Sequence, residues 1–463
     1  MSRSSQPLDN ARSPKRSRRN DFETGSGSTL RILRLVNIGR ILCRQRRSAG
    51  PIPRSPASPG RQSPVRYEVQ INLSTRNIVY VGSWPSPNGR EEANEGVYYE
   101  VHDCDGHTLC PGLVDIQING AYGIDFSNPS CDFADLRTTC VRLARERGVT
   151  SILPTVVSSP PEVYARLLRW RKPAIEEGYN GAKLLGWHFE GPFMSPKYKG
   201  AHDASCMLDP TVENVKKIYF SNDVKNDHDS TRIPLVLVTM APELPGAMDA
   251  ITHLTKDQNV VVSLGHTDAS YEVCHTATKS GASLLTHTFN AMAPFHHRKP
   301  GPVGLVVDGT MPRCSVICDG HHVSDVTIKM LRAVRPGGII LVSDGMAASG
   351  SEDGEYVLGD VRVTVKDGKA TVTGTGTLAG SCATLDQCVG LYRIITGCTW
   401  EEAWEAGSLR PAEAVNVDDV GIVEVGKRGD VALWEGVGDN GVYDKDTSKM
   451  KVICCWVGGR EVN

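Results

Sequence analysis

Residues 183–190 read KLLGWHFE, a short apolar run that ends in a carboxylate, and the same arrangement recurs along the chain. Short apolar runs separated by helix-like stretches are typical of parallel strands buried on both faces. Seven further runs of this kind are LVDIQI (113–118), SILPTVV (151–157), PLVLVTM (234–240), VVVSLGH (260–266), SLLTHTF (283–289), SVICDG (315–320) and GIILVSDG (338–345). We therefore predict an α/β fold, and about eight strands favour a closed (β/α)8 TIM-type barrel over a doubly wound open sheet.

The segments around these runs complete the predicted domain organisation. Periodic stretches predict helices at 133–147, 161–177 and 326–334. The segment 356–374 predicts a hairpin around Asp367-Gly368, because Asp-Gly favours tight hairpin turns. These patterns predict two domains, a barrel over 110–416 and a small β-sandwich that joins 66–109 to 417–463. In the sandwich segments, apolar and polar residues alternate in VRYEVQINL, and KVICCWV is a further predicted strand.

Residues 1–65 differ from the rest in composition. Residues 1–66 hold fifteen Lys and Arg against three acids, with much Ser, Pro and Gly. Such a segment buries too little apolar surface to offset its ordering entropy, so we predict a disordered basic tail. The exception is 30–42, LRILRLVNIGRIL, which is compatible with a strand or a basic amphipathic helix. The tail could be a nuclear or organellar address, a solvated extension, or the product of a wrongly assigned gene start.

The composition of the whole chain excludes several functional classes. The 51 basic and 53 acidic residues nearly balance, so no nucleic-acid partner is indicated. No run of about 18 apolar residues predicts a membrane helix, and no membrane partner is expected. The 14 cysteines form no CxxC pair, and we find no secretory signal peptide. Reduced thiols and a cytoplasmic location are the expectation.

Polar side chains stand where four of the predicted strands end. Glu190 ends KLLGWHFE, His266 ends VVVSLGH, His287 lies in SLLTHTF, and Asp344 ends GIILVSD. The carboxyl ends of barrel strands form one mouth, where active sites are built. One carboxylate and two imidazoles suit zinc with a position open for water, and Asp344 is placed to move a proton. Each residue taken alone could instead cap a loop or make a turn, but four at strand ends favour a site.

Three other polar segments leave their roles open. GTGTLAGS (374–381) resembles a phosphate loop but lacks the lysine of a P-loop, so it makes either a tight turn or a ligand contact. HHRKPG (296–301) is either an anion site through Arg298 and Lys299 or an exposed loop. At least one of His321 and His322 is expected to face the mouth, because they follow another strand.

The motifs, taken in order, resemble a known family. The blocks PGLVDIQINGAYGIDF, GWHFEGPFMSPKYKGAHD, VSLGHTDASYE, THTFNAMAPFHHRKPG, ICDGHHV, LVSDGMAASG and GTLAGS are similar to those of the N-acetylglucosamine-6-phosphate deacetylases, within the amidohydrolase superfamily. They are spread over most of the globular part. The resemblance implies a hydrolase of amino-sugar catabolism that converts N-acetyl-D-glucosamine 6-phosphate to D-glucosamine 6-phosphate and acetate.

The resemblance also implies roles for individual residues. Glu190, His266 and His287 match the metal ligands of the family, and Asp344 matches its catalytic acid/base. The resemblance further implies one divalent metal per subunit, with zinc as the expected ion, and a homodimer in which Arg298 reaches the partner's site. The positions that match substrate-binding segments are Ala201, His202 (near the amide carbonyl), Asn290, Ala291, Arg298, His322, Leu378, Ala379 and Gly380.

One departure from the superfamily bears on the number of metals. Many amidohydrolases carry His-x-His at the end of the first strand, and here Gln117 and Asn119 stand in its place. Amides hold a second metal poorly, so we predict a single metal, with Gln117 and Asn119 as further contacts. Two alternatives stay open. One is another amidohydrolase acting on cyclic amides or other N-acyl substrates, and the other is a non-catalytic sugar-phosphate sensor.

Overall fold

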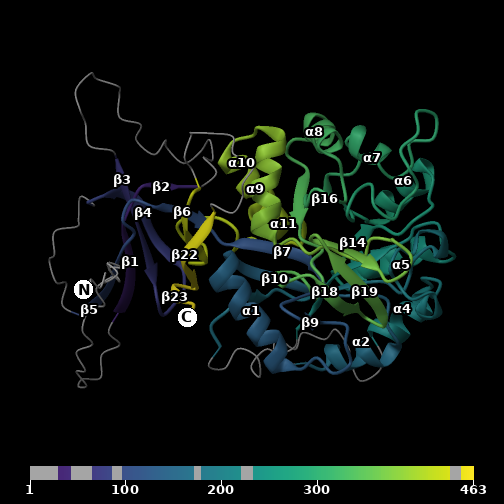
Figure 1. Cartoon of the computed structure of the whole chain (residues 1–463), viewed down its shortest axis with the longest axis horizontal. Coiled ribbons are helices and arrows are strands. Elements are labelled where there is room, and N and C mark those ends of the chain that lie inside the picture. The colour runs from purple at the N-terminus through teal and green to yellow at the C-terminus, as the bar shows by residue number, and fades with distance from the viewer. Residues whose placement is uncertain (1–29, 43–64, 86–95, 171–178, 221–232, 438–449) are drawn as a thin grey trace, which may run out of the picture.

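The computed structural model describes residues 30–42, 65–85, 96–170, 179–220, 233–437 and 450–463. Within these residues the chain forms a barrel with its helices and a β-sandwich at one end (Figure 1). The ends of the described chain meet in the sandwich, since its strands come from residues 30–111 and 431–461. No helix of the described part has the length and apolar character needed to span a bilayer.

The barrel contains the predicted parallel strands in chain order. Each apolar run becomes a strand, although 183–189 divides into the short strands β11 and β12. Almost every residue in these strands is buried, as expected for strands covered by helices on the outer face. The strands are β7 (Leu113–Ile118), β10 (Val149–Val156), β11 (Lys183–Leu184), β12 (Trp187–Glu190), β13 (Leu235–Met240), β14 (Val261–Leu264), β15 (Leu284–Leu285), β16 (Arg313–Ile317) and β17 (Ile339–Val342).

Backbone hydrogen bonds close the sheet into a barrel. The sheet runs β10-β12-β13-β14-β15-β16-β17, with β11 also paired to β10, and β7 pairs with β10 as well. At the carboxyl ends of β7 and β17, Asp344 N–H donates to the carbonyl of Gln117 in β7 at 2.9 Å, and Asn119 N–H donates to the carbonyl of Gly345 at 2.7 Å. The two strand ends are therefore neighbours, and the predicted closed barrel is confirmed.

Helices follow most of the barrel strands. Helix α1 has the predicted bounds because both ends carry local signals: Asp132 forms a capping box with Asp135, and Gly148 ends the helix in the left-handed conformation. The helices are α1 (Phe133–Arg147), α2 (Pro161–Leu168), α4 (Val212–Tyr219), α5 (Ala247–Thr252), α6 (Tyr271–Ser280), α7 (Gly304–Val307), α8 (Asp325–Val334), α9 (Leu385–Thr396), α10 (Trp400–Gly407) and α11 (Leu409–Ala414). The prediction of a helix over 161–177 was too long, since α2 ends at Leu168; residues 171–178 lie outside the described part.

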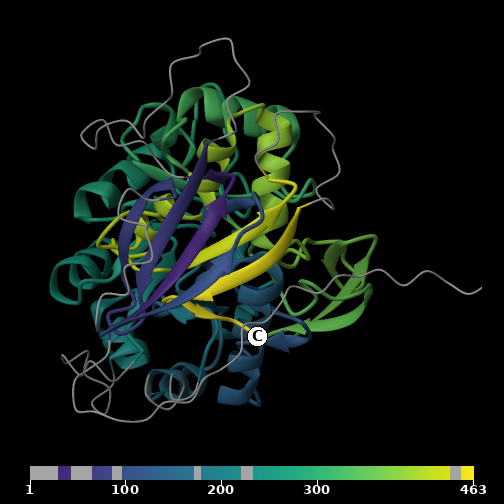
Figure 2. The same ribbon diagram turned by 90° about the vertical axis from the view of Figure 1, so that its left-hand side faces the viewer.

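The β-sandwich packs two sheets around its own core. One sheet has the order β4-β3-β1-β5 and the other β2-β6-β21-β22-β23 (Figure 2). Buried side chains of both sheets, including Leu35, Val69 and Trp456, form a single apolar cluster. The strands are β1 (Leu30–Ile38), β2 (Arg40–Ile41), β3 (Arg66–Asn72), β4 (Ile78–Trp84), β5 (Val97–Asp103), β6 (Thr108–Pro111), β21 (Val431–Glu435), β22 (Lys451–Val457) and β23 (Arg460–Glu461).

Strand β1 corrects the prediction of a disordered segment over 1–65. Residues 30–42, which were compatible with a strand or a helix, form β1 and β2. β1 pairs with β3 on one side and with β5 on the other, so it is an inner strand of its sheet. The sandwich therefore begins well before residue 66. Residues 1–29 and 43–64 lie outside the described part of the chain.

Two small sheets lie beside the barrel mouth. The predicted hairpin forms between β19 (Val361–Lys366) and β20 (Lys369–Val372), with Asp367 and Gly368 as its two-residue turn. Both turn residues have positive φ, 52° and 69°, as a type I′ turn requires. β18 (Gly354–Leu358) completes this three-stranded sheet, and β8 (Gly120–Ala121) pairs with β9 (Ile124–Asp125) after β7.

Two glycines that end helices provide a matched test of packing between the barrel and the sandwich. Gly148 and Gly397 both adopt φ 63°. A Cβ at Gly148 would lie 2.5 Å from Cζ2 of the buried Trp434, whereas a Cβ at Gly397 would meet nothing within 4 Å. We expect Gly397→Ala to cost about 1–2 kcal/mol through its left-handed backbone, and Gly148→Ala to cost a further ~1–3 kcal/mol through overpacking. Thermal unfolding of the two variants checks this, and equal shifts in Tm would contradict it.

Candidate active site at the barrel mouth

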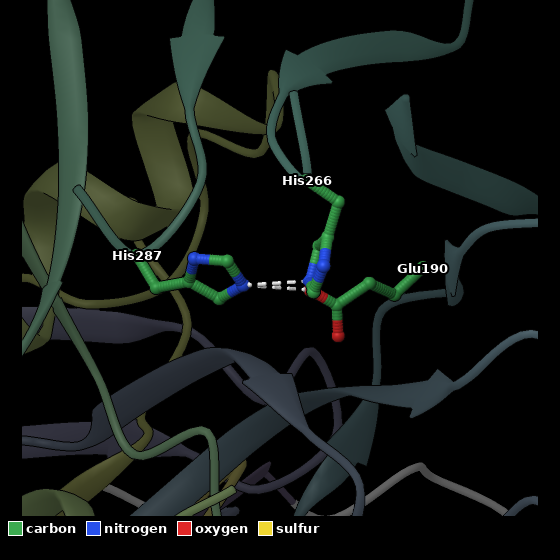
Figure 3. Close-up of side chains that lie close together, drawn as sticks. All are labelled: Glu190, His266 and His287. Atoms are coloured by element: carbon green, nitrogen blue, oxygen red, sulfur yellow. Dashed lines mark hydrogen bonds and ion pairs between the residues drawn. The ribbon is translucent and has the colours of Figure 1, made fainter. Parts of the chain in front are cut away.

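Three side chains from three strand ends meet at one point (Figure 3). Glu190 is the last residue of β12, His266 follows β14, and His287 follows β15. Oε1 of Glu190 lies 3.2 Å from Nε2 of His266 and 3.0 Å from Nε2 of His287. The two Nε2 atoms are 3.1 Å apart, and all three side chains are buried. The convergence predicted from the strand ends is therefore present in the structure.

The hydrogen bonding of His266 favours a cation between these atoms. Nδ1 of His266 lies 2.9 Å from the carbonyl of Tyr198, so this nitrogen donates and Nε2 of the neutral ring carries a lone pair. Nε2 lies 3.2 Å from Oε1 of Glu190, and in a metal-bound ring it would offer its lone pair to the cation. Bonds of ~2.1 Å in a tetrahedral site place ligand atoms about 3.4 Å apart, close to the spacing found here. One carboxylate and two imidazoles are thus arranged to hold one divalent cation.

The ionisation of the triad matches its geometry. Burial alone would raise the pKa of Glu190, but hydrogen bonds and charge from His266 and His287 lower the pKa well below its ordinary value. Burial disfavours the charged form of His287, yet the hydrogen bond and charge of Glu190 raise its pKa. Glu190 is therefore an anion across the neutral pH range and supplies the negative charge that a cation needs.

Asp344 lies beside the triad and is linked to it by an amide. Nε2 of Gln117 donates to Oε1 of Glu190 at 3.0 Å and to Oδ1 of Asp344 at 3.2 Å. Nδ2 of Asn119 donates to the same Asp344 oxygen at 2.8 Å. The amides of the first strand thus present N–H groups to the two carboxylates, where ligating imidazoles would present lone pairs.

The environment of Asp344 suits proton transfer. Burial and the nearby charge of Glu190 raise the pKa of Asp344 to about 7. A carboxyl group with such a pKa can both accept and return a proton near neutral pH. Because Asp344 lines the cavity beside the triad, it can exchange protons with a molecule bound there.

His202 faces the same cavity as a neutral donor. The backbone N–H of Ser158 donates to Nδ1 of His202 at 3.1 Å. Burial and the charge of His266 lower the pKa of His202 to about 3, so its ring is neutral. With Nδ1 accepting, the proton of the neutral ring lies on Nε2. The ring packs edge-on against His266 with centroids 4.5 Å apart, which places a hydrogen-bond donor next to the triad.

Three residues of the site have an uncommon backbone conformation. His266, His287 and Asp344 have φ of 48°, 27° and 46°, a region that non-glycine residues seldom occupy. Such conformations cost about 1–3 kcal/mol each and persist only where neighbouring structure holds them. The His287 N–H, for example, donates to Oγ of Ser315 on the next strand at 2.8 Å.

The triad, Asp344 and His202 line one cavity of about 490 Å³, which is large enough for a sugar phosphate. Its wall includes most of the residues that matched substrate-binding segments. These are Ala201, His202, Asn290, Ala291, His322, Leu378 and Gly380. Asn119, which was predicted as a first-strand contact, lines the cavity as well.

Three of the predicted contact residues lie elsewhere. Gln117 lies behind the cavity wall, where it bonds the two carboxylates. Ala379 is fully buried in the apolar cluster beneath the loop that contains Leu378. Arg298 is exposed and does not line the cavity of its own chain.

The cavity also contains residues that the sequence analysis missed. Lys197, Tyr198 and Lys199 line it between Glu190 and His202, and Leu358 lines it from the end of β18. The first three stand within the quoted block GWHFEGPFMSPKYKGAHD, so their position between two site residues was a usable signal. Leu358 had no such signal, because it belongs to a sheet outside the barrel pattern.

Comparisons with known proteins agree with this geometry. The model of the amidohydrolase family matches residues 108–462. The N-acetylglucosamine-6-phosphate deacetylase of Homo sapiens is 39% identical over 327 residues, which cover 69% of this chain and 77% of the human protein. The structure of N-acetylglucosamine-6-phosphate deacetylase from Pasteurella multocida matches with a TM-score of 0.74 at 25% identity, covering 93% of this chain and 99% of that one.

A second solved structure contains a ligand. It is a mutant of the N-acetyl-D-glucosamine-6-phosphate deacetylase from Mycobacterium smegmatis in complex with N-acetyl-D-glucosamine 6-phosphate. Its TM-score is 0.71 at 26% identity, and the match covers 94% of this chain and 99% of that one.

Removing the charge of Glu190 tests the cation site. Glu190→Gln keeps the shape of the side chain but replaces an anionic ligand by an amide, so we expect the purified variant to lose most of its bound metal. Elemental analysis of the folded protein measures this directly. Glu68→Gln is a matched control, because Glu68 is equally buried but lies in the sandwich, paired with Arg34 at 2.7 Å. Equal metal content in both variants would contradict the assignment.

Proposed function

Because the chain belongs to the amidohydrolase family, whose model matches residues 108–462, we propose that it deacetylates N-acetyl-D-glucosamine 6-phosphate to D-glucosamine 6-phosphate and acetate. The observation that carries this proposal is the convergence of Glu190, His266 and His287 beside Asp344 in one cavity. The human relative is named for this activity, and the mycobacterial relative was solved with this sugar phosphate. The proposed reaction is hydrolysis of a linear amide C–N bond in amino-sugar catabolism.

The proposed cofactor is one divalent metal ion per subunit, with zinc as the candidate. Glu190, His266 and His287 would hold it, since their ligand atoms converge and a carboxylate with two imidazoles is a common zinc-binding set. Such an ion polarises a carbonyl oxygen and makes an adjacent water more acidic. The single-metal proposal rests on Gln117 and Asn119, whose amide N–H groups already bond Glu190 and Asp344.

In the proposed mechanism, His202 orients the substrate. Its Nε2–H donates to the acetamide oxygen and stabilises the negative charge that develops there. Removing one such donor costs about 2.7–4 kcal/mol of barrier stabilisation in studied enzymes. A neutral ring suits this role because the Nε2 proton is fixed by the Ser158 N–H on the other ring nitrogen.

Asp344 transfers the proton in this mechanism. It accepts a proton from the attacking water as the water oxygen bonds to the acetyl carbon. It then donates that proton to the amine nitrogen as the C–N bond breaks, so the carboxylate returns to its starting state. Gln117 and Asn119 keep Asp344 oriented through both steps, since each donates to Oδ1.

We propose a homodimer in which Arg298 contacts the substrate bound to the partner subunit. Arg298 is exposed and absent from the cavity of its own chain, although its segment matched a substrate-binding block. We also propose a cytoplasmic location. The cysteines of the described residues are unpaired thiols, which suits a reducing compartment.

Acetate release tests the proposed function. Purified protein with its metal measured is given N-acetylglucosamine 6-phosphate, and unphosphorylated N-acetylglucosamine is the comparison. We expect fast release from the phosphorylated sugar, loss of release after chelation, and recovery when zinc is restored. No release despite about one metal per chain would sink the substrate assignment and favour another N-acyl substrate or a sensor role.

Asp344→Asn tests the proton-transfer role. The amide keeps hydrogen bonds but cannot accept the proton, and general acid–base catalysis contributes roughly 10²–10⁴-fold. We therefore expect kcat to fall by at least ~100-fold, with metal content preserved. A metal-loaded variant that turns over near the wild-type rate would show that another group moves the proton.

A further inference from the structure

The carboxylate of Asp319 accepts four hydrogen bonds, two of them from His322, which lines the cavity. It follows β16, and its side chain is 4% exposed. Oδ1 accepts from the backbone N–H groups of His321 and His322, both at 2.9 Å. Oδ2 lies 2.7 Å from Nδ1 of His322 and 3.1 Å from Oγ of Ser381. The proposed mechanism assigns no role to this buried acid.

The contacts of Asp319 determine how the ring of His322 is presented. Burial would raise the pKa of Asp319, but the hydrogen bond and charge of His322 hold it well below its ordinary value. An ionised carboxylate only accepts hydrogen bonds, so Nδ1 of His322 is the donor. Nε2 makes no hydrogen bond with a described residue, and His322 lines the cavity.

His202 and His322 both line the cavity, but their Nδ1 atoms have different hydrogen-bond partners. Nδ1 of His202 accepts from a backbone N–H, which leaves a neutral ring with its proton on Nε2. Nδ1 of His322 instead donates to a carboxylate, so a negative charge lies directly behind the ring. Such an arrangement is suited to bind an anionic oxygen through Nε2–H, because the carboxylate balances the positive charge of a ring that donates from both nitrogens.

Asp319 also connects His322 to the segment after β17 that contains Asp344. Ser381, whose hydroxyl donates to Asp319, has its backbone N–H on the carbonyl of Asp344 at 2.8 Å. The same carboxylate thus joins the cavity wall at His322 to the segment that carries Asp344. A displacement of the Asp319 carboxylate would move the wall that faces the substrate.

We propose that Asp319 is a positioning residue for the phosphate group of the substrate. It holds the imidazole of His322 through Nδ1 so that Nε2–H donates to a phosphate oxygen. The inference rests on the proposed function, which it deepens by assigning a residue that determines specificity for phosphorylated sugars.

Kinetics of a double-mutant cycle test this positioning role. The variants are Asp319→Asn, His322→Asn and the two together, assayed with N-acetylglucosamine 6-phosphate. Losing a charge-assisted hydrogen bond should raise KM about 10-fold in Asp319→Asn while kcat changes little. The double variant should be no worse than His322→Asn alone, because Asp319 acts through that ring. Additive losses in the double variant, or an unchanged KM in Asp319→Asn, would overturn the inference.

A matched control comes from another histidine–aspartate pair. Nδ1 of His253 lies 2.7 Å from Oδ2 of Asp257, the same distance as in the Asp319 pair, but this pair lies away from the cavity. Asp257→Asn should leave KM and kcat unchanged. A similar rise in KM in this variant would mean that the effect of Asp319→Asn is a general consequence of losing such a pair.

Binding measured without turnover separates this inference from the proposed function. Calorimetry with D-glucosamine 6-phosphate and with inorganic phosphate should show about 10-fold weaker binding to Asp319→Asn than to the unaltered chain. Weaker binding without any acetate release would support Asp319 and reject the deacetylase assignment. Acetate release together with unchanged binding and KM would support the deacetylase assignment and reject the role of Asp319.

A measurement on the unaltered chain keeps the inference testable if Asp319→Asn does not fold. In protein with 15N-labelled histidine, the His322 resonances, identified by their loss in His322→Asn, should report a protonated Nδ1. Addition of inorganic phosphate should shift the Nε2 resonance. A bare Nδ1, or an Nε2 resonance that phosphate does not move, would contradict the inference.

Discussion

The backbone hydrogen bond from Asp344 N–H to the carbonyl of Gln117 joins the last barrel strand to the first, and the site depends on that closure. Without it, the carboxyl ends of β7 and β17 would be opposite edges of an open sheet. With it, Asp344 comes within hydrogen-bond reach of Gln117 and Asn119, and Gln117 reaches Glu190 on β12. The catalytic carboxylate and the triad are therefore neighbours because the sheet is closed.

Closure also brings two buried carboxylates together, and their charges require compensation. Glu190 faces two imidazoles, while Asp344 faces amide donors and has a pKa raised to about 7. The two acids thus differ in what they can do: one remains an anion and suits a cation, and the other suits proton exchange. Asp319 is a further acid with a buried side chain, and it contacts the cavity through the ring of His322.

The sequence was sufficient to predict the barrel, helix α1 and the triad, because each carries a local signal. The apolar runs reveal buried strands, the capping box and Gly148 bound α1, and the polar residues stand where strands end. Strand β1 was ambiguous because its partners, β3 and β5, are remote in sequence and its arginines, Arg31 and Arg34, are three residues apart, a spacing that also suits one face of a helix. The left-handed backbone of His266 and Asp344, and the hydrogen bond that fixes the His202 proton, follow from tertiary contacts and have no local signal.

In the proposed site, Glu190, His266 and His287 hold a single cation. Anomalous X-ray diffraction from crystals of the zinc-loaded protein, measured on both sides of the zinc absorption edge, tests it most directly. We expect one anomalous peak within bonding distance of Oε1 of Glu190 and both Nε2 atoms. No peak at the triad, or a second peak of equal height beside Gln117 and Asn119, would contradict it.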